Sequence, residues 1–123
     1  MMIEDRTMPV YKQLAEKISD DILRRKYSVD ERIPSMREVA SEFQININTA
    51  QRAFDLLQQN GIIYKERGMG YYVSKDAYSL ITKMRKDNFV NETLPSVFAT
   101  MQTLNIPMED IIKTYNQSNI NKK

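Results

Sequence analysis

The chain has 123 residues, of which 41% are hydrophobic and 28% are charged, and it contains no cysteine, histidine or tryptophan. That length suits one ordinary domain, or a small domain with an appendage. The lack of cysteine excludes disulfides and thiolate metal sites, and the lack of histidine removes the commonest general base and metal ligand. The sequence therefore predicts a binding protein without a cofactor, metal site or catalytic residues, and not an enzyme.

Lysine and arginine number 18 against 16 aspartates and glutamates, a net charge of +2. Residues 1–76 hold as many acidic as basic side chains, so nucleic-acid binding would depend on where the cations lie. No apolar stretch is long enough to span a bilayer, and the acidic N-terminus lacks the apolar segment of a secretion signal. The expected location is the cytoplasm, with no membrane partner.

A first helix is expected to begin at Pro9, since the first helical turn tolerates a missing N–H, and to run to about Tyr27. A polar connector, residues 28–32, follows it. Pro34 then favours an extended conformation at Ile33, which could pair as a very short strand.

The run Ser35-Met36-Arg37-Glu38 is a capping box that begins a helix of about ten residues. Asn46 is a good N-cap for a further helix over about 47–60, which Gly61 ends. Two β-prone runs, 62–65 and 71–73, then flank a glycine turn at 66–70 and predict a hairpin with a cationic tip. This order of elements is a winged helix-turn-helix, assigned to residues 1–76.

Residues 77–123 read as helical again. Pro95 either kinks one long helix or starts a second one, and both alternatives remain open. Asn105-Ile106-Pro107 is a break, a short helix follows around Met108 to Tyr115, and the polar residues 118–123 are expected to fray. The predicted fold is mainly α with a small β-hairpin: a winged helix-turn-helix domain followed by a short helical dimerisation segment, residues 77–123.

In a helix-turn-helix, the first turns of the second helix contact base edges in the major groove, where asparagine, glutamine and arginine are suited to bidentate contacts. Each candidate has a simpler explanation: Asn46 as a cap, the wing cations as a solvated turn, and Arg37 as an ion-pair partner of Glu38 or Glu42. Their placement on one predicted face favours DNA binding. The candidate DNA-binding residues are Arg37, Asn46, Asn48, Thr49, Gln51, Arg52, Lys65, Arg67 and Gly68.

Four blocks of this sequence, residues 33–40, 46–53, 61–63 and 68–73, resemble the GntR family of bacterial transcription regulators. The resemblance covers about residues 9–73. The Asn-x-Asn-Thr start of the recognition helix and the short tail look like the YtrA-like subfamily. The resemblance implies a DNA-binding homodimer that acts on an inverted-repeat operator, most often as a repressor.

The resemblance also implies roles for individual residues. The family's phosphate-contacting arginine falls on Arg37, its recognition-helix contacts on Asn46, Asn48, Thr49 and Gln51, with Arg52 alongside, and its wing contacts on Arg67 and Gly68. The chain departs from the family pattern at three positions. Ile47 stands where an arginine is common, and Arg25 and Asp30 replace glycines that are usual before the Pro-Ser block, so the loop there could differ in shape.

Apolar side chains of the tail have no domain core of their own, so they could pack across a two-fold axis. The alternative is that they cover the winged helix of their own subunit. A small-molecule effector has no support, although Met84, Met101 and Met108 could adapt to a pocket between subunits. The candidate dimer residues are Leu80, Ile81, Met84, Val97, Phe98, Met101, Ile111 and Ile112.

A second function fits the balanced charge of residues 1–76. In this alternative the winged helix is a protein-protein interaction module without sequence-specific DNA binding.

Overall fold

The computed structural model describes residues 8–120, with side chains through Ser118. The chain forms two compact units that divide between Met84 and Arg85. The first unit contains α1 (Val10–Leu23), α2 (Met36–Phe43), α3 (Ile47–Gln59), β1 (Ile63–Glu66), β2 (Gly70–Val73) and most of α4 (Ala77–Asn88). The second contains the end of α4, the π-helical segment η1 (Phe89–Thr93), α5 (Leu94–Leu104) and α6 (Met108–Ile120). The predicted class, mainly α with one hairpin, is confirmed.

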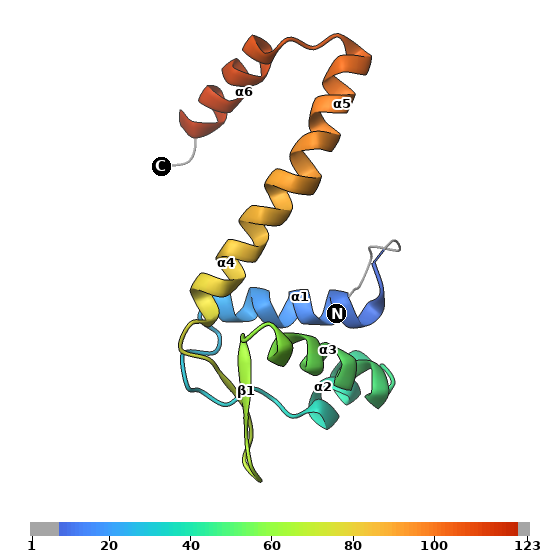
Figure 1. Ribbon diagram of the computed structural model, residues 1–123, viewed down its shortest axis with the longest axis vertical. Helices are drawn as coiled ribbons and strands as arrows, with labels where there is room; N and C mark the ends of the chain where they lie inside the picture. Colours follow the sequence, from blue (N-terminus) through green and yellow to red (C-terminus); the bar gives the residue numbers. More distant parts are fainter. Residues whose placement is uncertain (1–7, 121–123) are drawn as a thin grey trace. The chain divides into compact units, whose positions relative to one another are not determined.

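The first unit is built around the inner face of α3. Ala50, Ala53, Phe54 and Leu57 are buried on that face, at the spacing expected of an amphipathic helix. They pack with the apolar faces of α1 and α2 and with β-strand residues in one continuous core. Figure 1 shows α2 and α3 on the same side of α1, with the hairpin projecting away from α1.

The hairpin is antiparallel, and its register pairs Ile63 with Val73 and Tyr64 with Tyr72. Because side chains alternate between the faces of a strand, Ile63 and Val73 enter the core while the two tyrosines lie on the other face. The rings of Tyr64 and Tyr72 stack there, 5.8 Å between centroids. The hairpin therefore has one core-facing side and one aromatic side.

The predicted short strand before Pro34 pairs with β2. An antiparallel bridge joins Arg32 to Tyr72, and the Ile33 amide donates to the Tyr71 carbonyl at 2.9 Å. The bridge centres on Arg32, one residue before the predicted position.

The first helix ends about one turn earlier than predicted. α1 stops at Leu23, and Arg25 takes a left-handed conformation with φ 66°. This change of direction returns the chain so that Tyr27 packs against the core from outside the helix. The predicted end near Tyr27 is wrong because tertiary packing of that ring overrides the helical pattern.

Two residues of the loop between α1 and α2 have left-handed backbone conformations that glycine adopts more easily. They are Arg25, with φ 66°, and Asp30, with φ 63°, both at positions where the resemblance to the family pattern predicted a loop of different shape. Both side chains make contacts that offset the strain. The Arg25 guanidinium lies 4.2 Å from the centroid of the Tyr78 ring, and Asp30 accepts a hydrogen bond of 2.9 Å from the Tyr64 hydroxyl.

The backbone is helical without interruption from Ala77 to Leu104. Pro95 has no N–H for the preceding turn and its ring crowds the carbonyl there, and the π-helical turn η1 lies directly before it. The structure thus decides between the two alternatives for Pro95 in favour of one helical run with a π-helical insertion.

The last helix is longer than predicted. α5 ends at Leu104 with Asn105 in the left-handed conformation, and α6 continues to Ile120. The predicted helix end near Tyr115 is wrong. Of the residues predicted to fray, 118–120 are helical and 121–123 lie outside the described residues.

We expect Phe54→Ala to lower the free energy of unfolding of the first unit by about 3–5 kcal/mol, the usual cost of truncating a buried phenylalanine. The ring is 0% exposed and contacts Tyr71 edge-on, with 5.0 Å between centroids. Urea unfolding followed by circular dichroism, at one fixed protein concentration, measures the change. The exposed Gln58→Ala on the same helix is the control, expected within about 0.5 kcal/mol of the parent. Equal effects of the two variants would contradict the assigned core.

Candidate nucleic-acid interface

The turn between α2 and α3 presents the N-terminus of α3 to solvent. Gln44 has φ 54° and ends α2, and Asn46 caps α3. The Asn46 carbonyl oxygen Oδ1 accepts the backbone N–H of Asn48 at 2.7 Å. The predicted cap is confirmed. It uses the side-chain oxygen Oδ1 of Asn46, which leaves the side-chain donor Nδ2 for an external contact.

The outer face of α3 carries polar side chains. Asn48, Gln51, Arg52 and Asp55 are exposed, and Thr49 is half-buried. Amide side chains can accept and donate at once, which is the pattern that an adenine edge requires in the major groove. This face therefore has the chemistry for direct base contacts.

Arg52 differs from the other residues of this face, because its guanidinium lies 4.1 Å from the centroid of the Tyr11 ring on α1. Such a cation–π contact is worth about 0.5–1 kcal/mol at an exposed site. Tyr11 therefore holds Arg52 toward α1. The sequence placed Arg52 beside Asn48 and Gln51 but could not show this contact, since 41 residues separate the two side chains.

The N-terminus of α2 has the predicted capping box. The Ser35 hydroxyl accepts the Glu38 amide at 3.1 Å, and the Glu38 carboxylate accepts the Ser35 amide at 2.8 Å. The hydrogen bond from the Ser35 backbone holds the pKa of Glu38 below its usual value, and the Ser35 hydroxyl and the charge of Arg32 act in the same direction.

Arg37 lies on the exposed side of this helix. In the described part of the chain it forms no ion pair with Glu38 or Glu42, so the simpler explanation offered for it does not hold. Its charge is available at the helix that crosses the DNA backbone in a helix-turn-helix.

The wing tip exposes Lys65, Arg67 and Gly68. The turn is closed by the Met69 amide, which donates to the Glu66 carbonyl at 2.9 Å. Gly68 has φ +71°, and apart from its sequence neighbours no atom of the described residues lies within 4 Å of the position of a Cβ, so its backbone is open to close approach by another molecule. The Lys65 ammonium lies 5.8 Å from the Tyr71 ring and Arg67 remains at the tip.

One cation that the sequence analysis did not select lies at the base of the wing. The Arg32 guanidinium lies against Gly70, where an added Cβ would stand 2.8 Å from Nε. The sequence gives one indication of this position: the predicted pairing of Ile33 implies that the preceding residue, Arg32, lies beside the second strand of the hairpin.

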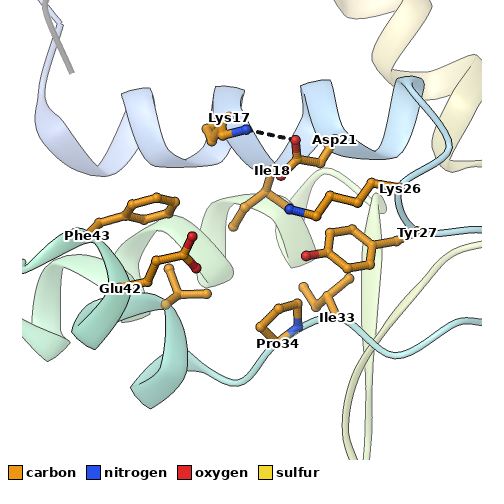
Figure 2. Close-up of a pocket in the computed structure, with 10 residues that line it drawn as sticks. Lys17, Ile18, Asp21, Lys26, Tyr27, Ile33, Pro34, Glu42 and Phe43 are labelled. Atoms are coloured by element: carbon orange, nitrogen blue, oxygen red, sulfur yellow. Dashed lines mark hydrogen bonds and ion pairs between the residues drawn. The ribbon is translucent and has the colours of Figure 1, made fainter. Parts of the chain in front are cut away.

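A small cavity of about 50 Å³ lies between α1, the following loop and α2 (Figure 2). Figure 2 shows the Lys26 ammonium and Tyr27 hydroxyl directed into it, with Glu42 opposite. The volume is far below the roughly 300–1,000 Å³ of ligand pockets.

Within residues 8–120, none of the helices has the length and apolar composition that a membrane span requires. No three acidic side chains of these residues lie together in a way that could hold a metal ion.

The structure corrects the candidate dimer set at the start of α4. Ile81 is 2% exposed and belongs to the core of the first unit, so it cannot contact a second subunit without unfolding. Leu80 is half-buried, with its Cδ1 only 3.3 Å from the position that a Cβ on Gly61 would take. For Ile81, burial in the core of the first unit fits the alternative, in which the tail residues cover the winged helix of their own subunit.

In the second unit, most of the candidate dimer residues are accessible. Val97, Phe98 and Ile112 are exposed, as is Met84 at the end of the first unit, and Ile111 is half-buried. Met101 is the exception, since it is 8% exposed. An open groove of about 580 Å³ runs along the turn between α5 and α6, lined by Phe98, Met101, Gln102, Ile106 and Met108 among others.

Together, the three-helix core, the paired wing and the exposed polar face of α3 define a winged helix-turn-helix DNA-binding domain. Residues 10–73 match the model of the bacterial regulatory proteins of the gntR family. The chain belongs to the GntR family and is a transcriptional regulator with a DNA-binding domain, in a family of regulators rather than enzymes.

Two curated relatives from Bacillus subtilis (strain 168) match most of the chain. The uncharacterized HTH-type transcriptional regulator YhcF is 30% identical over 112 residues, covering 89% of this chain and 91% of the relative. The HTH-type transcriptional repressor YtrA is 26% identical over 103 residues, covering 84% and 78%. This similarity agrees with the predicted YtrA-like assignment. Other matched relatives are much longer, and the chain spans only 16–23% of four of them.

Solved structures show the same fold. A GntR-family transcriptional regulator from Bacteroides thetaiotaomicron has a TM-score of 0.81 and 37% identity, covering 94% of this chain and all of that one. The DNA-binding domain of AraR in complex with operator ORX1 has a TM-score of 0.54 and 28% identity, covering 60% and 89%.

The Glu38 cap predicts a pH-dependent stability. A carboxyl whose pKa is lowered by folding stabilises the folded state above its unfolded pKa, about 4.3, and this stabilisation is lost as the pH falls through the folded pKa. Glu38→Ala should therefore lower the thermal midpoint at neutral pH, and the difference from the parent should shrink in acid. Ser41→Ala, at an exposed position of the same helix without a titratable side chain, is the control, and its difference from the parent should not change with pH. A difference in thermal midpoint between Glu38→Ala and the parent that does not change with pH would contradict the capping role.

Proposed function

We propose that this chain is a homodimeric repressor that binds an inverted-repeat operator through α3 and the wing. The observation that carries the proposal is the exposed polar face of α3, with Asn48 and Gln51 at its centre. A similar domain, that of AraR, is described in complex with operator DNA, and the similar regulator YtrA is named as a repressor.

The proposed contacts divide into two classes. Asn48 and Gln51 read base edges, and the Nδ2 group of Asn46 and the hydroxyl of Thr49 support them at the start of α3. Arg37 at α2 and the cations Lys65 and Arg67 at the wing contact phosphates, which fix the register without reading sequence. Arg52 contributes charge from the side of α3 that faces Tyr11.

A dimer supplies a second winged helix, which binds the second half-site of the operator. One winged helix contacts few bases, and each good contact discriminates by about 1–3 kcal/mol, so doubling the module on a palindromic site raises specificity. The exposed apolar residues of α5 and α6 and the open groove at their turn support a dimer formed through the second unit. We assign the groove to side chains of the second subunit, because it is too open to enclose a small molecule.

The two classes of contact predict two classes of mutant. Arg37→Ala and Arg67→Ala should weaken binding to all duplexes by a similar factor and flatten the salt dependence, because each lost phosphate contact removes about 0.9 from the slope of log K against log salt. Asn48→Ala and Gln51→Ala should relax base preference and leave the slope unchanged. Operators selected from random DNA, followed by binding isotherms at several salt concentrations, measure both effects.

Lys12→Ala, which removes an exposed cation from α1, is the control and should match the parent. Identical behaviour of the two mutant classes would refute the division of roles. A parent chain without salt-sensitive DNA binding would refute the regulator and favour the protein-interaction module suggested by the balanced charge of the first 76 residues.

The proposed dimer predicts that Ile112→Glu yields monomers, because it places a charge within the apolar interface at a residue that is 52% exposed in the single chain. Light scattering should give twice the chain mass for the parent and the single-chain mass for the variant. Gln117→Glu adds the same charge to an exposed position of α6 and should remain dimeric. A dimeric Ile112→Glu variant would show that the interface lies elsewhere.

A further inference from the structure

Arg32 lies in the connection between α1 and α2, and its backbone is fixed by the sheet. It bridges to Tyr72, and the residues on either side hydrogen-bond to β2: the Val73 amide donates to the Glu31 carbonyl at 3.0 Å, and the Ile33 amide donates to the Tyr71 carbonyl at 2.9 Å. Arg32 therefore forms an isolated antiparallel bridge beside the two-stranded sheet, at the base of the wing.

The side chain of Arg32 lies across Gly70. A Cβ added to Gly70 would stand 2.8 Å from the Arg32 Nε and 3.4 Å from Nη2, so a side chain at this position would displace the guanidinium. Gly70 also has φ +107°, which side-chain-bearing residues rarely adopt. The wing glycine thus leaves space for a cation that comes from a different part of the sequence.

The charge of Arg32 is not neutralised by an ion pair within residues 8–120. It acts on Glu38, whose pKa it helps to lower, but the Glu38 carboxylate accepts its hydrogen bond from the Ser35 amide. Arg32 is also exposed. An exposed guanidinium without an ion pair in the described residues, next to both the wing and the α2 N-terminus, is suited to bidentate binding of a phosphate.

We propose that Arg32 binds a backbone phosphate of the DNA beside the wing, and that Gly70 leaves the space that the guanidinium occupies. This inference rests on the proposed function. It adds a further proposed phosphate contact, at the base of the wing, to those of Arg37 on α2 and Arg67 at the wing tip.

The experiment compares Arg32→Ala, Arg32→Gln and Arg32→Lys in the full-length chain, with the selected operator and with an unrelated duplex, over a series of salt concentrations. Removal of the charge should reduce the salt slope by about 0.9 per subunit, hence by about 1.8 for a dimer, and lower affinity for both duplexes by the same factor. Arg32→Lys keeps the charge and should keep the slope. Arg32→Gln keeps much of the stem, so it tests the charge even where Arg32→Ala unfolds.

Arg24→Ala is the matched control, since Arg24 pairs with Asp20 and its loss should leave the slope unchanged. A parent-like slope for folded Arg32→Ala or Arg32→Gln overturns the inference while the proposed function stands. A changed base preference also overturns it, because a phosphate contact carries no sequence information. A parent chain without salt-dependent DNA binding overturns the proposed function as well.

Discussion

The edge-to-face contact between Phe54 and Tyr71 links the two parts of the DNA-binding surface. Phe54 is fully buried on the inner face of α3, and Tyr71 is only 8% exposed on the core side of β2. Because the two rings are rigid and close-packed, the wing cannot shift relative to α3 without opening the core. The same burial turns Asn48 and Gln51 outward, so the packing of one helix face decides what the opposite face can bind.

Around this core, local hydrogen bonds determine where each helix of the helix-turn-helix begins. The Ser35–Glu38 box satisfies free amides of α2, and Asn46 satisfies one of α3. These caps place both helix N-termini, with their partial positive charge, at the exposed side of the domain. At the α2 end, the exposed Arg37 stands beside the capping carboxylate of Glu38, so this end carries a cation and an anion side by side.

The loop between α1 and α2 shows how backbone strain is compensated. Arg25 and Asp30 hold left-handed conformations, and each side chain contacts a tyrosine, Tyr78 and Tyr64 respectively. Tyr64 belongs to the wing and Tyr78 to α4. The loop therefore keeps a conformation that glycine would take more easily, and in exchange it gains contacts that tie it to neighbouring elements.

Local sequence signals determined the order of elements, both caps, the glycine-ended α3 and the polar face of that helix, because caps and periodicity involve residues only a few positions apart. Only the tertiary structure decided which side chains the cationic residues contact. Arg52 contacts Tyr11, Arg32 lies over Gly70, and Ile81 enters the core of the first unit. Each of these facts depends on residues that are far apart in the sequence, whose proximity arises only when the helices and the hairpin pack together.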